Sequence, residues 1–148
     1  MKKALLIIGI LFLMAITQNC KSQSTEIVVP VAENNQDQLK RVWMLVEFQN
    51  FAKEDLIKNK AQMNLKDLKI PSANMGCNSI SFNCVVKKDN LKFIAGMRTE
   101  MFCQDKMQLE DAFCLALQGD YSYKIAGQKL FLSNSKNEKM TFVAQDWD

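Results

Sequence analysis

The most regular feature of the sequence is a set of short segments in which hydrophobic and polar positions alternate, the spacing of a β-strand. The first segment, residues 42–48 (VWMLVEF), is apolar at nearly every position, which predicts a strand buried on both faces. The longest, residues 72–86, has Gly76 in its first half, where we expect a bend or bulge. The predicted strands, separated by polar or glycine-containing turns, are residues 42–48, 61–65, 72–86, 91–94, 121–126, 129–133 and 139–144.

One segment has the spacing of an amphipathic helix instead. Its apolar positions recur every three or four residues, the period of an α-helix. Asp105 is placed as an N-cap with Gln108 three residues later, as in a capping box, and Gly119 stands at the C-terminal end. The apolar stripe consists of Leu109, Ala112, Phe113, Ala116 and Leu117.

The order of these elements predicts the fold class. Several strands, one helix and three further strands, joined by short turns, favour antiparallel pairing. We therefore expect a mainly β (α+β) fold: a single domain over residues 41–148, with a curved antiparallel β-sheet wrapped around one amphipathic helix. A chain of 148 residues with 48% hydrophobic content has room for one such core. A curled sheet can also enclose an apolar cavity, so a small-ligand-binding module is the alternative function, its ligand unknown.

The N-terminus is typical of an exported protein. Lys2 and Lys3 precede an apolar run at residues 4–16, which spans only about 20 Å as a helix, short of a ~30 Å bilayer core. We interpret residues 1–19 as a signal peptide, and it resembles that of a bacterial lipoprotein because Cys20 follows the apolar run. An ordinary secreted protein is the alternative, but no small-x-small cleavage site lies nearby. Lipidation of Cys20, with palmitate among the chains attached, would anchor the protein to a membrane that it does not span.

The segment after the signal peptide predicts how the domain is attached. Residues 20–40 are mostly polar, and we interpret them as a tether that begins at the lipidated Cys20. We expect a lipid-anchored protein of the bacterial cell envelope, located at the outer membrane. Its expected partners are the membrane, through the lipid, and other envelope proteins.

Charge and composition exclude several functions. The formal net charge is +3, and without Lys2 and Lys3 the remaining 17 basic and 16 acidic residues leave +1, so no nucleic-acid partner is expected. The chain contains no histidine, which excludes Ser-His-Asp and Cys-His catalysis and histidine-containing zinc sites. We expect no enzymatic activity, no metal and no cofactor.

Four cysteines lie in the expected domain. In an oxidising compartment an even set is first interpreted as disulfides, and four cysteines allow three connectivities. Cys77 and Cys84 are seven residues apart, so they would lie on opposite faces of a strand and could bridge each other only across a bend. A thiol oxidoreductase, the least favoured function, usually has a Cys-x-x-Cys pair, and the chain has none. The spacings of 7, 19 and 11 do not suit a four-cysteine zinc site. The four residues are Cys77, Cys84, Cys103 and Cys114.

A group of short motifs carries a family resemblance. They are Gly76-Cys77-Asn78, then Thr99-Glu100-Met101-Phe102-Cys103, then Glu110 with Phe113 and Leu117, then KLFL at residues 129–132, with Trp43 as an opening tryptophan. In order and spacing, over about residues 41–143, they resemble the META domain family, which includes a bacterial heat-shock lipoprotein. The resemblance implies a small domain with an antiparallel sheet curved around a helix. It also implies roles in stress response, envelope integrity and antibiotic tolerance, without established catalysis.

The resemblance also implies one disulfide. Cys77 and Cys103 belong to two of the shared motifs, so the family pattern favours a bridge between them. Cys84 and Cys114 are then left as a second pair, which would link a strand to the helix. Each bridge would close a loop of around thirty residues and contribute about 3–4 kcal/mol.

The remaining motif residues have a structural and a functional interpretation. We expect Gly76 to permit a close backbone approach and the Asn78 amide to satisfy peptide groups at the bend, although both would also suit a ligand pocket. The Thr99 hydroxyl is expected to bond the backbone before the helix, although Thr99 with Arg98 would suit an anion. Glu110, near the helix start, is favoured by the helix dipole, with an acid or base as the alternative role.

Overall fold

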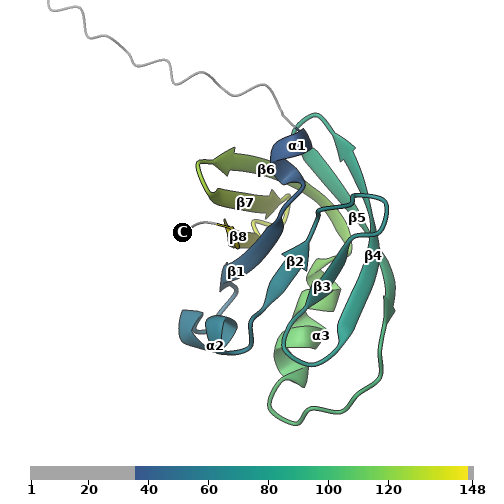
Figure 1. Cartoon of the computed structure of the whole chain (residues 1–148), viewed down its shortest axis with the longest axis vertical. Coiled ribbons are helices and arrows are strands. Elements are labelled where there is room, and N and C mark those ends of the chain that lie inside the picture. Colours follow the sequence, from purple (N-terminus) through teal and green to yellow (C-terminus); the bar gives the residue numbers. More distant parts are fainter. Residues whose placement is uncertain (1–35, 147–148) are drawn as a thin grey trace, which may run out of the picture. The chain divides into compact units, whose positions relative to one another are not determined.

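The structure, a computed structural model, describes residues 36–146, which form a β-barrel with three short helices (Figure 1). Eight antiparallel strands follow one another around the barrel in chain order, and the last strand pairs back with the first. The strands are β1 Val42–Phe48, β2 Gln62–Asn64, β3 Ser72–Asn74, β4 Ser79–Lys87, β5 Asn90–Arg98, β6 Gly119–Ala126, β7 Lys129–Asn134 and β8 Lys139–Ala144. The predicted class, a mainly β single domain with a curved antiparallel sheet, is confirmed.

Strand β1 shows how the sequence pattern becomes a barrel wall. Trp43 and Leu45 are buried on one face, and a register shift after Leu45 turns Phe48 to the same face. Such a bulge places two residues of one strand opposite one residue of its partner. The other face of β1 is only half-buried. The prediction of a strand buried on both faces was therefore wrong, because only the inner face of the barrel is covered.

The interior of the barrel is filled by large side chains. Alternate residues of β4, β6, β7 and β8 point inward over much of each strand, as the period of a strand requires. Phe113 of the third helix packs edge-to-face against Phe48, with ring centroids 5.9 Å apart. The largest fully buried side chains are Trp43, Phe48, Phe93, Phe113, Tyr121 and Phe142.

The helices differ in part from the prediction. The predicted helix is α3 Met107–Ala116, with Leu109 and Phe113 buried as expected. Its N-cap is Lys106, without a side-chain cap hydrogen bond, so the predicted capping box at Asp105 is not formed. The expected C-cap, Gly119, instead opens β6. The other two helices, not predicted, are α1 Gln36–Leu39 and α2 Lys53–Lys58.

The ordered domain begins before the predicted boundary at residue 41. In α1, Leu39 is fully buried and its carbonyl accepts a hydrogen bond from Trp43 Nε1 at 2.9 Å. The last residues of the expected tether therefore belong to the domain. The predicted signal peptide, Cys20 and the tether up to residue 35 lie outside the described residues. Within the described part of the chain, no helix is long and apolar enough to cross a membrane.

Strand β5 is paired on both sides only along its first half. Its pairing with β6 runs from Asn90 to Phe93, where Phe93 lies opposite Gly119. Its pairing with β4 continues to Arg98, with a register shift between Ile80 and Phe82. Beyond Phe93, β5 therefore has a partner strand only in β4. Helix α3 lies beside this second half (Figure 1). Residues of both β5 and α3 line one cavity.

Candidate functional site

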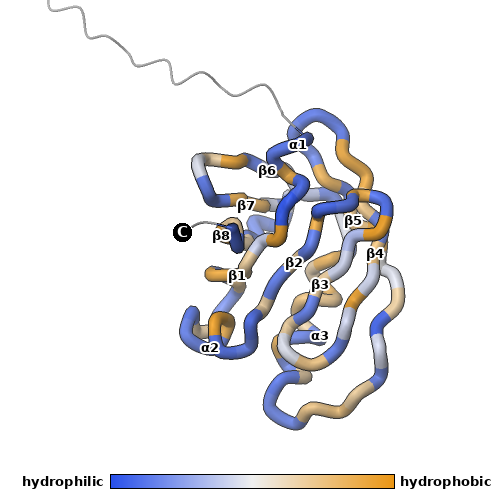
Figure 2. Tube along the Cα trace, viewed as in Figure 1, coloured by the Kyte–Doolittle hydropathy of each residue, from blue (hydrophilic) through white to orange (hydrophobic). Residues whose placement is uncertain are grey.

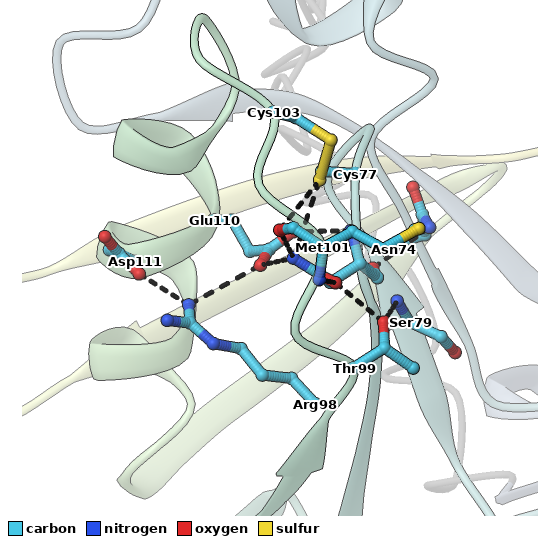
Figure 3. Close-up of polar contacts among 10 residues, drawn as sticks. Asn74, Cys77, Ser79, Arg98, Thr99, Met101, Cys103, Glu110 and Asp111 are labelled. Atoms are coloured by element: carbon cyan, nitrogen blue, oxygen red, sulfur yellow. Dashed lines mark hydrogen bonds and ion pairs between the residues drawn. A yellow bond between two sulfur atoms is a disulfide. The ribbon is translucent and has the colours of Figure 1, made fainter.

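Two fully buried polar residues, Asn78 and Glu110, form the centre of the candidate site (Figure 3). Asn78 lies in the bend between β3 and β4, and Glu110 lies in the first turn of α3. The Asn78 peptide N–H donates to Glu110 Oε2 at 2.7 Å, and Asn78 Nδ2 donates to Glu110 Oε1 at 2.7 Å. Both carboxylate oxygens are thus engaged by one residue. Because a buried carboxylate is costly without such bonds, the contact fixes the helix to the bend.

The rest of the Asn78 side chain holds the 99–106 loop, which we define as the segment between β5 and α3. Asn78 Oδ1 accepts a hydrogen bond from the Met101 peptide N–H at 2.8 Å, and Asn78 Nδ2 donates to the Met101 carbonyl at 3.0 Å. The Thr99 hydroxyl donates to Asn78 Oδ1 at 2.7 Å and accepts from the Ser79 peptide N–H. The Asn78 amide therefore satisfies peptide groups of the loop, and Thr99 bonds the backbone of β4.

Arg98 closes the cluster on the solvent side. Its Nη1 lies 3.5 Å from Glu110 Oε1 and 2.5 Å from Asp111 Oδ1. The hydrogen bond from Arg98 to Asp111 is the main cause that raises the pKa of Arg98 above its ordinary value. Glu110 thus has a cation beside it as well as two N–H donors. Its main role is to connect α3 to the β3–β4 bend, and the expected interaction with the helix dipole is secondary.

A disulfide joins the same two segments. The Cys77–Cys103 bond is present, with the sulfur atoms 2.02 Å apart and the Cα atoms 6.0 Å apart. The 99–106 loop is therefore tied at Thr99, at Met101 and at Cys103.

The expected second bridge, between Cys84 and Cys114, was wrong. Both are free thiols. Cys114 lines a cavity with Ile80 and Phe82 of β4, whereas Cys84 is not among the residues that line it. The two cysteines therefore do not face the same cavity. Burial raises the pKa of Cys84 to about 11 and also raises the pKa of Cys114.

Gly76 occupies a position that other residues fit poorly. Its φ is +110°, and a Cβ there would lie 2.9 Å from Asn59 Cβ. Asn74 Oδ1 accepts the Gly76 N–H at 2.7 Å, and Lys106 Nζ donates to the Gly76 carbonyl at 2.9 Å. Gly76 therefore lets the chain turn tightly next to α2.

The sequence-predicted residues do not all meet in one place. Gly76, Asn78, Thr99, Met101 and Glu110 surround the cluster with the disulfide, whereas Trp43 ties α1 to the barrel wall. Sequence reasoning missed four further members: Asn74, Ser79, Lys106 and Asp111. These are common polar residues, and they carry no local signal in the sequence.

The cluster is saturated with hydrogen bonds. Every polar atom of the Asn78 side chain and both Glu110 oxygens have partners. Within the described residues, no group of three or more cysteine and acidic side chains is placed to hold a metal ion. The arrangement therefore acts as a structural clamp on the 99–106 loop.

A cavity of about 220 Å³ lies beside this clamp, half-open to solvent. Its lining is mainly apolar and comes from β4, β5 and α3, including Phe82, Met97, Cys114 and Leu117. It is smaller than the 300 Å³ or more of a typical small-molecule site, and it lies between α3 and the strands. This argues against a carrier that encloses its ligand.

Comparison with known proteins places the fold. A family model described as META domain matches residues 37–147. An NMR structure of a protein from Burkholderia xenovorans is similar with a TM-score of 0.61 and 17% identity, covering 78% of this chain and 90% of that one. A second NMR structure is similar with a TM-score of 0.56 and 17% identity, covering 72% of this chain and 91% of that one. At this identity the likeness shows the fold alone. No curated protein matches the sequence significantly.

Proposed function

Because the chain belongs to the META domain family, we propose that it is a lipid-anchored protein of the bacterial cell envelope, without enzymatic activity, that supports envelope integrity under stress. The outer membrane is the proposed location. Its domain acts by contact with other envelope components, and neither a small-molecule ligand nor a nucleic acid is its partner.

The Cys77–Cys103 disulfide is the observation that supports this proposal most directly. Structural disulfides persist in oxidising compartments and are rare in the cytosol. A bridge within the domain therefore agrees with the lipoprotein-like signal that precedes Cys20.

The saturated clamp supports a binding role over a catalytic one. Catalysis requires groups that are free to exchange protons or to touch substrate, and Asn78 and Glu110 use their polar atoms on each other and on the loop. The clamp holds the 99–106 loop at the surface, where the Phe102 side chain is 82% exposed and accessible to a partner.

Deletion and complementation test the proposal. Cells that lack the protein are expected to become permeable to a dye normally excluded by the outer membrane after heat shock. Wild-type protein restores the barrier, whereas Cys20→Ala, which lacks the anchor, does not. Cys84→Ala, a matched cysteine change away from the anchor, is the control and also restores it. Unchanged permeability of the deletion strain under heat and antibiotic stress would contradict the proposal.

A further inference from the structure

The second half of β5 and helix α3 enclose an open groove between them. From Ile94 to Arg98, β5 pairs with β4 alone. Among the described residues, no backbone hydrogen bond links this half of β5 to α3, and only the Arg98 side chain reaches across. This edge of β5 is thus a strand edge facing a helix. Unpaired strand edges are templates for pairing with another chain.

β5 carries a bulge beyond Phe93, the last residue that pairs with β6. The register with β4 shifts between Ile80 and Phe82, so β5 carries one extra residue there. Gly96 sits at this shift, and a Cβ on it would lie 2.0 Å from the Ser81 carbonyl oxygen. A bulge bends its strand and increases the local twist. The irregular course of β5 beside the groove is therefore set by its backbone, which leaves no room for a side chain at residue 96.

Exposed apolar side chains are concentrated in the segment that contains the groove. Of the large hydrophobic residues that the described part of the chain exposes, five lie within residues 94–115, and Met97 is the one of them that lines the cavity. Met97 on β5 is 80% exposed, and Leu115 on α3 is 71% exposed. Figure 2 shows the hydrophobic stretch of the lower loop between hydrophilic ends. The five are Ile94, Met97, Met101, Phe102 and Leu115. Concentrated exposed apolar surface of this kind marks an interaction site.

The cavity of about 220 Å³ lies at the floor of this groove. It is open toward solvent, and its mainly apolar walls come from β4 and β5 on one side and from the end of α3 on the other, with the polar side chains of Arg98 and Gln118 among them. It offers room for one apolar side chain. The groove combines an unpaired strand edge, a cavity for a side chain and exposed apolar residues. These features together suit a β-strand of a partner, because a lipid or small molecule does not supply alternating peptide donors and acceptors.

The charge of this segment indicates the partner's charge. Residues 94–118 contain two basic and four acidic side chains, a net charge of −2 within a chain of +3. Glu100 and Asp105 are exposed and form no salt bridge among the described residues. A second copy of the same face, or an anionic lipid surface, would be repelled. In Figure 1 the 99–106 loop also lies at the opposite end of the domain from α1.

We propose that the groove between the second half of β5 and α3 binds an extended segment of a partner protein, which adds a strand to β5. One apolar side chain of the segment fills the cavity, others contact Met97 and Leu115, and lysine or arginine residues flank them. The inference deepens the proposed function by naming the class of partner. It rests on the proposed function in one respect only, which is that the partner is located in the cell envelope.

The test uses the full lipidated chain purified in detergent and a phage library of random ten-residue peptides. Selected peptides are expected to alternate apolar and basic residues. They are also expected to protect from hydrogen exchange those amides of residues 94–98 that do not already bond to β4 or to Ser81. Met97→Lys and Leu115→Lys, both at exposed positions, are expected to weaken binding of a selected peptide at least tenfold. Ile70→Lys is the matched control, because Ile70 is 76% exposed in the turn before β3. It should change affinity by less than twofold.

The outcomes separate this inference from the proposed function. The inference would be overturned if the selection enriched no peptide. It would also be overturned if Ile70→Lys and Met97→Lys weakened the affinity for a selected peptide equally. Binding of phosphatidylglycerol vesicles through this face, with loss on Leu115→Lys, would assign it to a membrane and also overturn it. Since the binding test uses purified protein, it succeeds or fails independently of the permeability test in cells.

Discussion

Asn78 and Glu110 are joined by two hydrogen bonds of 2.7 Å, although they lie 32 residues apart in the sequence. One bond comes from the peptide N–H of Asn78 and the other from its side-chain amide. Both residues are fully buried, so water cannot replace either bond. This pair connects the β3–β4 bend to α3, and through Met101 it also positions the 99–106 loop.

Replacing Glu110 by glutamine tests this connection. An amide has one acceptor oxygen where the carboxylate has two, so one Asn78 donor loses its partner in a buried place. We expect the free energy of unfolding to fall by about 2–3 kcal/mol. Urea unfolding followed by tryptophan fluorescence measures it. Asp111→Asn is the control, because its exposed contact with Arg98 contributes at most about 1 kcal/mol. An equal loss for both variants would show that the buried pair has no special role.

Removal of the Cys77–Cys103 disulfide is expected to lower the free energy of unfolding by about 3–4 kcal/mol, because the bond closes a loop between residues with a sequence separation of 26. The measurement is urea unfolding of the Cys77→Ser/Cys103→Ser variant. Dithiothreitol should lower the stability of the wild type and leave this variant unchanged. A Cys84→Ser/Cys114→Ser variant should still respond to dithiothreitol, since its disulfide is intact. If it did not respond, the two free thiols would be the ones that form the bridge.

Gly76 is expected to resist substitution more than a glycine in open space. Gly76→Asn places a side chain at φ +110° against Asn59, and we expect a loss of about 2 kcal/mol or more. Gly127→Asn is the matched control, because Gly127 has φ +58°, which asparagine tolerates, and nothing lies within 4 Å of a Cβ there. Thermal melting compares the two. Equal melting temperatures would remove the requirement for glycine at the bend.

The raised pKa of Cys84 predicts a loss of stability at high pH. Its folded pKa of about 11 exceeds the ordinary 9.0, so the folded state keeps the proton that the unfolded chain loses first. The contribution of Cys84 is therefore complete below pH 9 and lost as the pH rises from 9 to about 11. Urea midpoints across this range should fall more steeply for the wild type than for Cys84→Ala. Parallel curves would place the Cys84 thiol in water.

Local patterns predicted most of the barrel. Alternation located the three C-terminal strands nearly to the residue, since each has one inner face that must be apolar. The nearly continuous apolar run of residues 42–48 located β1. The 3.6-residue stripe located α3. Helix α2 was missed because it is one and a half turns long, mostly charged, and buries only Leu56, which gives no periodic signal.

The candidate site was harder to predict for a physical reason. Motif resemblance named Asn78, Thr99 and Glu110, but the contacts among them depend on how the bend, the loop and the helix pack together. The incorrect pairing of Cys84 with Cys114 arose in the same way. Counting cysteines gives no information on how α3 packs against β4, and that packing decides which thiols can meet.

The most direct test of the account is the mass of the protein extracted from membranes, measured intact and after reduction with alkylation. The account predicts a mature chain that begins at a lipidated Cys20, with one disulfide and two free thiols. It is contradicted by an unprocessed chain that begins at Met1 and carries five reduced thiols.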